Sequence, residues 1–113
     1  MIKIKATLAT TEPFIHLDKT MSFSQDDLCR MADTAAGLPI TVDFNLDEVV
    51  GFIISAEVVE SKLLCDIELK YKPFNGRECF LVPGTIFNEE EQKHEKLMAC
   101  ALTRNTQLVL PPL

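Results

Sequence analysis

The sequence has no long run of apolar residues. A helix that crosses a bilayer needs roughly 18 or more in a row, and no stretch of the chain approaches that length. The first residues, MIKIKATLATTEPF, alternate apolar and polar side chains and lack the continuous apolar centre of a secretory signal peptide. We therefore expect an intracellular protein with no signal peptide and no transmembrane segment.

Positive charge and aromatic side chains are also scarce. The 113 residues include 11 Lys and Arg against 17 Asp and Glu, a formal net charge of -6, and only 7% are aromatic. The Lys and Arg residues form no stripe, whereas binding to nucleic acid or to an anionic membrane surface depends on clustered positive charge. Neither nucleic acid nor a membrane is therefore an expected partner.

Paired cysteines are missing as well. The four cysteines are Cys29, Cys65, Cys79 and Cys100, and no two of them have the C-x-x-C spacing that is common in structural zinc sites. Apolar residues make up 47% of the chain, which is enough for a core without disulfides. We expect four small, buried, reduced side chains, and we expect no metal and no cofactor.

What the sequence does contain is a set of strand patterns and one helix pattern. Residues 2–9, IKIKATLA, alternate strictly and predict a half-buried strand. Residues 24–36 predict the main helix, with Ser24 as N-cap, acidic residues in the first turn and an apolar stripe of period 3.6. Gly37 is placed as the residue after the helix end, and Pro39 prevents continuation.

Further strands follow the helix. The segments VVGFIISAEVV and KLLCDIELK are separated by a short polar break at residues 60–62 and predict a hairpin with one inward face. ECFLVPGTIF is apolar but broken by Pro83-Gly84, NEEEQKHEK reads as a solvated helix or loop, and KLMACALT predicts a last buried strand. The expected fold is one β-rich α+β domain over residues 1–113, with a mostly antiparallel sheet or small barrel.

The stretch TVDFNLDEVVGF contains the densest group of carboxylates between two apolar runs. Asp43, Asn45 and Asp47 have the alternating spacing of a calcium loop. However, such a loop needs glycine at its sixth position and glutamate at its twelfth, and these places hold Glu48 and Ile54. We interpret the stretch as an acidic turn between two strands.

Nucleophilic catalysis finds little support in the spacing of residues. His94 lies in a run of charges and is expected to be solvated, and His16 is expected on the outer face of a strand. A Cys-His pair of His16 with Cys79 or Cys100 stays open, although no spacing favours it. The four serines have no nucleophile-elbow sequence around them.

Three segments, in order, resemble the prohead protease and scaffold proteins of tailed bacteriophages, particularly the phage Mu type. The first is GLPITVDFNLDEVVGFIISAEVVESKLLCDIELK, which has the family's glycine-bearing strand at residues 51–53 and its hairpin partner at 64–69. The second, ECFLVPGTIF, is similar to the strand that carries the family's serine and proline. The third contains Ala101-Leu102-Thr103 followed by Asn105, similar to the family's ALT ending. The resemblance covers about residues 24–110.

The departures from the family concern its catalytic residues. The family's histidine belongs at or just after Phe44, where this chain has Phe44, Asn45 and Leu46. The family's serine belongs just before the proline of the second segment, where this chain has Val82. Because none of these side chains is a nucleophile or a base, the resemblance implies a protein that is not a serine protease.

The resemblance therefore implies a non-enzymatic phage or prophage module with a catalytically inactive prohead-protease-like fold, in the host cytoplasm or the virion. Its expected role is structural or in capsid assembly, and its partner is another protein or a second copy of itself. The vacated groove, near Phe44, Asn45, Val82 and Pro83, is the expected binding site for an extended segment, by strand addition. Two alternatives stay open: a cysteine-dependent hydrolase, and an unrelated small protein-binding domain.

Overall fold

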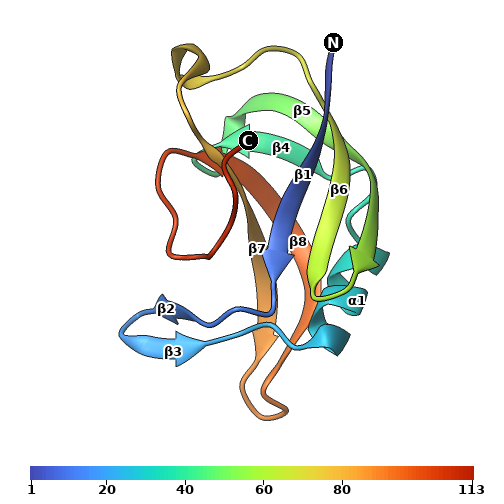
Figure 1. The fold of residues 1–113 in the computed structure, drawn as a ribbon, viewed down its shortest axis with the longest axis vertical. Helices are drawn as coiled ribbons and strands as arrows, with labels where there is room; N and C mark the ends of the chain where they lie inside the picture. The colour runs from blue at the N-terminus through green and yellow to red at the C-terminus, as the bar shows by residue number, and fades with distance from the viewer.

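A computed structural model describes residues 1–113 as a six-stranded sheet, one α-helix and a separate two-stranded hairpin (Figure 1). The elements in chain order are β1 (Ile2–Thr10), β2 (Phe14–His16), β3 (Lys19–Met21), α1 (Gln25–Asp33), β4 (Pro39–Val42), β5 (Asn45–Val59), β6 (Lys62–Leu69), η1 (Phe74–Gly76), β7 (Phe80–Asn88) and β8 (Lys93–Thr103). The sheet order is β1-β6-β5-β4-β8-β7, and β2 pairs only with β3. The predicted β-rich α+β class is confirmed.

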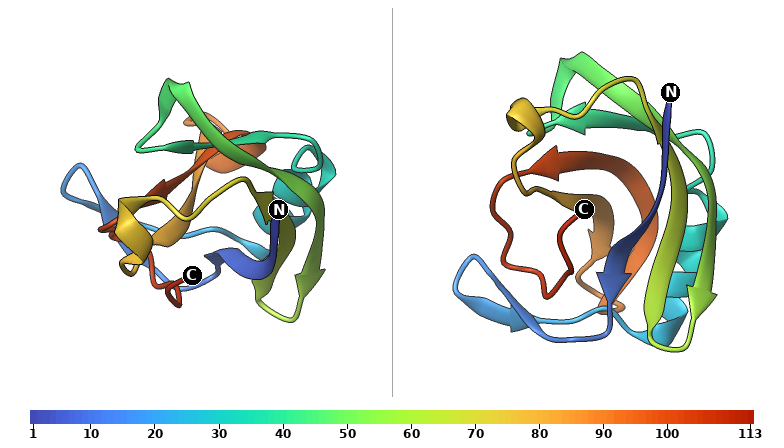
Figure 2. Two further views of the ribbon diagram at one scale, coloured as in Figure 1. Left: turned by 90° about the horizontal axis from the view of Figure 1, so that it is seen from above. Right: turned by 45° about the horizontal axis from the view of Figure 1, so that its top comes forward.

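The large sheet is mostly antiparallel, as predicted, and it curls strongly. β4 and β8 form its one parallel pair. The curl turns the edge strands β1 and β7 toward each other, so that the sheet makes a half-barrel (Figure 2). The C-terminal residues 111–113 lie against both edge strands, and the Leu113 N–H donates to the Cys79 carbonyl at 2.8 Å. The tail thus fills the gap between β1 and β7, two strands that would pair directly in a closed barrel.

The hairpin of β5 and β6 follows the predicted alternation. The inward residues of β6 are buried: Leu63, Cys65, Ile67 and Leu69. Gly51 on β5 is required by close packing, because a Cβ added there would lie 2.1 Å from the Glu68 carbonyl oxygen. The strands turn at Glu60, which has a φ of 57°. The hairpin prediction is therefore confirmed in its position and its buried face.

The helix α1 begins where the sequence predicts and ends earlier. Ser24 and Asp27 form a capping box, in which each side chain accepts from the backbone N–H of the other. The predicted end at residue 36 is wrong, because Thr34 leaves the helix and its hydroxyl bonds both the N–H and the carbonyl of Leu97 on β8, each at 3.1 Å. Gly37 is therefore not the residue after the helix; its N–H donates to the Ile53 carbonyl at 2.8 Å.

The hairpin of β7 and β8 differs most from the sequence prediction. Pro83-Gly84 does not break the apolar segment, since β7 runs through both residues as an edge strand. An edge strand tolerates proline because one side of its backbone has no ladder partner. The expected solvated segment NEEEQKHEK is a short turn followed by the start of β8. His94 therefore lies in a strand, not in a loop.

Candidate functional site

The four residues expected at a vacated groove lie around three strands. Asp43 and Phe44 form the two-residue turn from β4 to β5, and both have positive φ, as a type I′ hairpin turn requires. Val82 lies on β7, and its pairing partner on β8 is Ala101, which pairs in turn with Thr41 of β4. The turn and Val82 are thus separated by one strand, β8, rather than being on neighbouring strands.

Phe44 nevertheless reaches across toward β7. A Cβ added to Gly84 would lie 3.3 Å from the Phe44 Cε1 atom, so the ring packs on the glycine. Val82 and Pro83 line the largest cavity of the molecule, and so does Gly84, whereas Phe44 and Asn45 do not. Asn45 is exposed and accepts a hydrogen bond from the Asp47 N–H at 3.0 Å, within the turn.

The acidic stretch is a hairpin turn with exposed carboxylates. Asp43, Asp47 and Glu48 are all exposed, and Glu48 accepts a hydrogen bond from the Tyr71 hydroxyl at 3.1 Å. No group of three or more His, Cys, Asp or Glu side chains in the chain is placed to hold a metal ion. The turn therefore offers surface charge and no ligand set.

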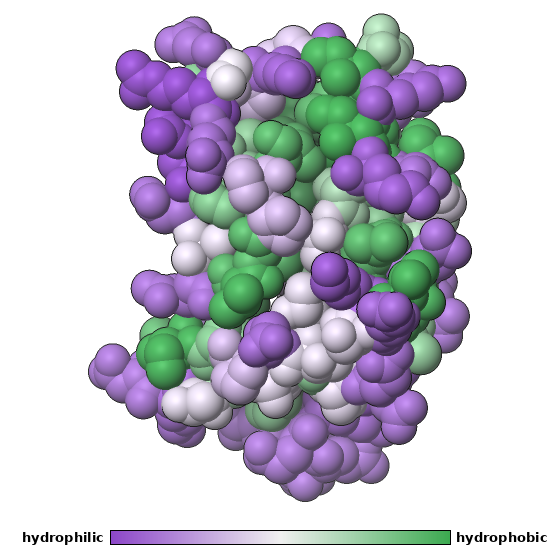
Figure 3. Space-filling view, in the orientation of Figure 1, coloured by the Kyte–Doolittle hydropathy of each residue, from purple (hydrophilic) through white to green (hydrophobic).

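The largest cavity lies between β7, the β2–β3 hairpin and the tail, and we call it the β7 cavity. Its volume is about 420 Å³. Its lining consists of Phe14, Ile15, His16, Met21, Phe23, Val82, Pro83, Gly84, Thr85, Phe87, His94, Thr106, Gln107 and Leu108. None of these residues is Lys, Arg, Asp or Glu, although such residues make up 25% of the chain. Figure 3 shows apolar residues at the surface on and above the β2–β3 hairpin, at the lower left.

His94 forms one wall of the β7 cavity, and its expected exposure is wrong. The side chain is only 4% exposed, because the pairing of β7 with β8 turns it inward between two phenylalanines. The ring centroids of Phe23 and Phe87 lie 4.5 and 4.7 Å from that of the imidazole. His94 Nδ1 lies 2.8 Å from Thr85 Oγ1, whereas Nε2 has no hydrogen-bond partner.

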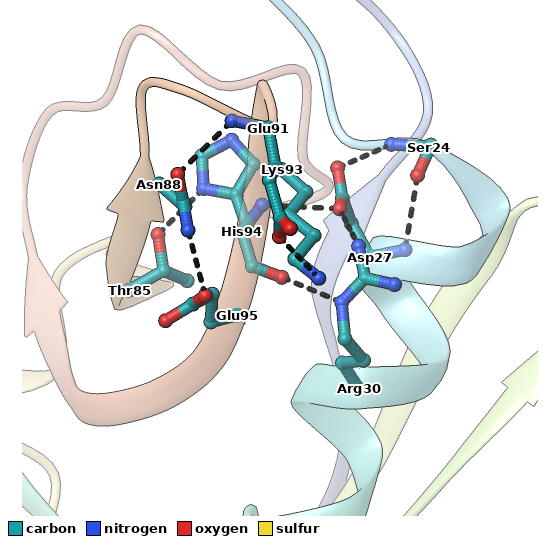
Figure 4. Close-up of polar contacts among 9 residues, drawn as sticks. All are labelled: Ser24, Asp27, Arg30, Thr85, Asn88, Glu91, Lys93, His94 and Glu95. Atoms are coloured by element: carbon teal, nitrogen blue, oxygen red, sulfur yellow. Dashed lines mark hydrogen bonds and ion pairs between the residues drawn. The ribbon is translucent and has the colours of Figure 1, made fainter.

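The backbone of His94 is fixed to the helix by buried polar contacts (Figure 4). Its N–H donates to Asp27 Oδ1 at 3.1 Å, and its carbonyl accepts from Arg30 Nε at 2.9 Å. Arg30 and Asp27 also form an ion pair, and Asp27 accepts from the Ser24 N–H at 2.9 Å. One carboxylate thus joins the start of α1 to the start of β8.

These contacts determine the charge state of both groups. Burial alone raises the pKa of Asp27, but the N–H donors of Ser24 and His94 outweigh it, and the pKa falls below its usual value. Burial lowers the pKa of His94, with Asp27 opposing and Arg30 adding to this effect. Because an unperturbed histidine titrates near 6.5, the imidazole is neutral at pH 7.

Local sequence patterns indicate only part of this cluster. Asp27 was expected in the first helical turn, at the positive end of the helix dipole, and this is correct, but its burial was not predicted. The spacing of Ser24 and Asp27 is that of a capping box. It therefore indicates one hydrogen bond of Asp27, the one that its carboxylate accepts from the Ser24 N–H. No local pattern places Thr85 and Arg30 beside His94, because their proximity depends on strand pairing and helix packing.

The cysteines are arranged as small core residues, with one exception. Burial raises the pKa of Cys65 and of Cys100 to about 12, and it also raises the pKa of Cys79. Cys100 Sγ donates to the Pro39 carbonyl at 3.4 Å, and His16 is exposed on β2. Cys29 was expected to be buried and is exposed, because it lies on the outward side of α1.

Comparison of the chain with models of protein families, with curated proteins and with solved structures gives no match. None of its helices has the length and apolar character needed to cross a membrane. The resemblance to prohead proteases therefore rests on the sequence segments described above.

Proposed function

We propose that the chain is a non-enzymatic protein-binding module that holds a segment of another protein in the β7 cavity. The observation that carries this proposal is the neutral lining of a 420 Å³ cavity on a chain with a net charge of -6. Cavities of this size with mostly apolar walls and a few polar groups are typical binding sites. The resemblance to prohead proteases makes phage or prophage assembly, in the host cytoplasm or virion, the setting that we propose.

The positions at which the family has its catalytic residues support a binding role. The positions of the family's histidine and serine hold Phe44, Asn45 and Val82, which supply neither a base nor a nucleophile. A thiolate at Cys65 or Cys100 is disfavoured at neutral pH because each thiol has a pKa of about 12. Neither the family's catalytic positions nor these two thiols therefore supply a nucleophile to the cavity.

The edge of β7 shapes how a segment would dock. Pro83 supplies no N–H, and the pairing of β7 with β8 is irregular after Gly84 and after Ile86. Proline and bulges on an edge strand oppose the regular addition of another strand. We therefore propose that the bound segment is held by side chains inserted into the cavity, rather than by a continuous ladder along β7.

A matched pair of variants tests this function. Ile15 on the cavity wall is 50% exposed, and Ile54 on β5, outside the cavity, is 52% exposed. We expect short peptides selected from a displayed random library to lose at least about tenfold in affinity on Ile15→Glu, because a buried unpaired charge is costly. Ile54→Glu is expected to bind as the unmodified chain does. Equal effects of the two changes, or a library that yields no binder, would contradict the proposal.

A second candidate function is hydrolysis with a hydroxyl nucleophile, because Thr85 Oγ1 lies 2.8 Å from His94 Nδ1 in the cavity. The imidazole has no carboxylate on its other nitrogen, which in catalytic triads orients the ring. We expect a fluorophosphonate probe to leave the protein unmodified by mass spectrometry. A stoichiometric adduct on Thr85 would support the hydrolase instead.

The cysteine-dependent hydrolase is tested by thiol alkylation. Cys29 is exposed, whereas Cys65, Cys79 and Cys100 are buried. We expect iodoacetamide to modify Cys29 at the rate of an ordinary exposed thiol and the other three only on unfolding. Mass spectrometry of the unmodified chain and of Cys29→Ser measures both rates. A fast thiol that survives in Cys29→Ser would favour the enzyme.

A further inference from the structure

The chemistry of the β7 cavity restricts what it receives, and this inference rests on the binding function proposed above. The lining has no Lys, Arg, Asp or Glu side chain, so none of these residues would recover the cost of removing a charged ligand group from water. Three phenylalanines, Phe14, Phe23 and Phe87, stand on its walls, and the rings of Phe14 and Phe23 pack at 5.2 Å. Such walls suit a neutral aromatic ring.

One polar atom in this apolar wall lacks a partner. His94 Nε2 makes no hydrogen bond, although its ring is almost fully buried. A buried polar atom without a partner costs free energy that a ligand recovers by supplying one. The bond between Nδ1 and Thr85 Oγ1 is compatible with either tautomer, so Nε2 is a donor in one and an acceptor in the other.

A phenolic hydroxyl satisfies Nε2 in both tautomers, because it donates and accepts. We propose that the β7 cavity receives the tyrosine side chain of a partner protein, with the ring among the phenylalanines and the hydroxyl at His94 Nε2. The chain's own single tyrosine does not serve, because Tyr71 already donates its hydroxyl to Glu48 at 3.1 Å. Docking of Tyr71 from a second copy would have to break this bond, so we propose another protein as the source of the ring.

Entry of the tyrosine requires a small rearrangement. Nε2 is closed off from solvent in the unbound protein, and Phe87, whose ring packs against the imidazole at a tilted angle, is itself only half-buried. Rotation of such a side chain on binding is common at protein interfaces, while the backbone stays in place. Asp27 and Arg30 hold the backbone of His94 in place, so we expect the imidazole to keep its position when the hydroxyl binds.

Side-chain analogues test the proposal without knowledge of the partner. p-Cresol represents tyrosine and toluene represents phenylalanine. By NMR titration we expect p-cresol to bind at least roughly fivefold more tightly than toluene, as one added hydrogen bond provides. His94→Phe is expected to keep toluene binding and to remove the preference. Equal affinities, or a preference that persists in His94→Phe, would overturn the proposal.

A measurement on the unmodified protein covers the case in which His94→Phe does not fold. The ring nitrogen signals of His94 report on hydrogen bonding directly. We expect the Nε2 signal to shift on addition of p-cresol and to stay in place on addition of toluene. A shift with both compounds or with neither contradicts the assigned contact.

Peptides separate this inference from the binding function itself. Short peptides that differ only in a central Tyr or Phe are expected to show the same preference, and Ile15→Glu is expected to weaken both. Peptides that bind in an Ile15-dependent way without a preference for Tyr would overturn the tyrosine assignment and leave the binding function. If the cavity prefers p-cresol to toluene but binds no peptide, the proposed binding of a protein segment is contradicted.

Discussion

The acidic turn at residues 43–48 and the single carboxylate Asp27 make an instructive contrast. The turn has three carboxylates, Asp43, Asp47 and Glu48, and all are exposed. Asp27 is 3% exposed and bonds two backbone N–H groups and one guanidinium. The turn is the more conspicuous feature of the sequence, but Asp27 joins two elements of the fold. Whether an acidic group stabilises the fold depends on its burial and on nearby hydrogen-bond donors. The number of carboxylates that lie close together in the sequence does not decide it.

The physical reason lies in the elements that carry these groups. Asp43 is in the two-residue hairpin turn, and Asp47 and Glu48 are exposed at the start of β5, so all three carboxylates keep their hydration. Asp27 is in the first turn of a helix that packs against β8, so it loses water and gains the donors of His94 and Arg30. Three changes test this contrast, in order of decreasing expected effect.

Removal of the buried carboxylate is expected to cause the largest loss. Asp27→Ala leaves the partly buried Arg30 without its anion and removes acceptors from the N–H groups of Ser24 and His94. We expect the free energy of unfolding to fall by about 3 kcal/mol. Urea denaturation followed by circular dichroism measures it. Asp26→Ala, in the same turn but exposed, is the control and is expected to cost less than about 0.5 kcal/mol. Similar losses of unfolding free energy in the two variants would contradict the proposed difference between buried and exposed carboxylates.

Acidification is expected to have an intermediate effect, through His94. Its pKa is lowered in the folded state, so the unfolded chain binds a proton at a higher pH. The contribution of neutral His94 to the free energy of unfolding is therefore complete above 6.5, the pKa of the histidine in the unfolded chain. It declines as the pH falls below this value, by at most about 1.4 kcal/mol per pH unit. The lowered pKa of Asp27 acts separately, because its contribution is lost only as the pH falls below 3.8.

Unfolding free energies measured between pH 7.5 and 5 (roughly, the range over which histidine titrates) test this dependence. The variant His94→Phe keeps an aromatic ring between Phe23 and Phe87 and has no proton to gain. We expect its stability to be nearly independent of pH in this range. A slope that is the same in both proteins would assign the effect to other groups.

Changes in the acidic turn are expected to have the smallest effect. Asp47→Asn and Glu48→Gln remove exposed charges, and each is expected to change the unfolding free energy by less than about 0.5 kcal/mol. Added calcium is expected to leave the melting temperature unchanged, since the turn has no set of ligands. A rise in melting temperature with calcium that disappears in Asp47→Asn would reverse the interpretation of the turn.

The parts of the fold that local patterns determine were predictable. The alternation of β6 identified its buried face, and Ser24 with the acidic residues after it identified the start of α1. Contacts between distant residues were not predictable. Thr34 ends the helix by bonding Leu97, and strand pairing buries His94 despite the charges beside it in the sequence. The groove residues Val82 and Pro83 line the cavity, but no local pattern places the β2–β3 hairpin, which forms its other wall, beside β7.

The parallel pairing of β4 with β8 has a consequence for how the chain folds. β4, β5 and β6 are joined by short turns, and so are β7 and β8, whereas Thr41 and Cys100 are 59 positions apart. Bringing such distant residues together costs loop-closure entropy before any contact is gained. The three-stranded unit of β4, β5 and β6 and the hairpin of β7 and β8 are therefore expected to form first, and their docking along β4 and β8 is expected to be the slow, rate-limiting event of folding.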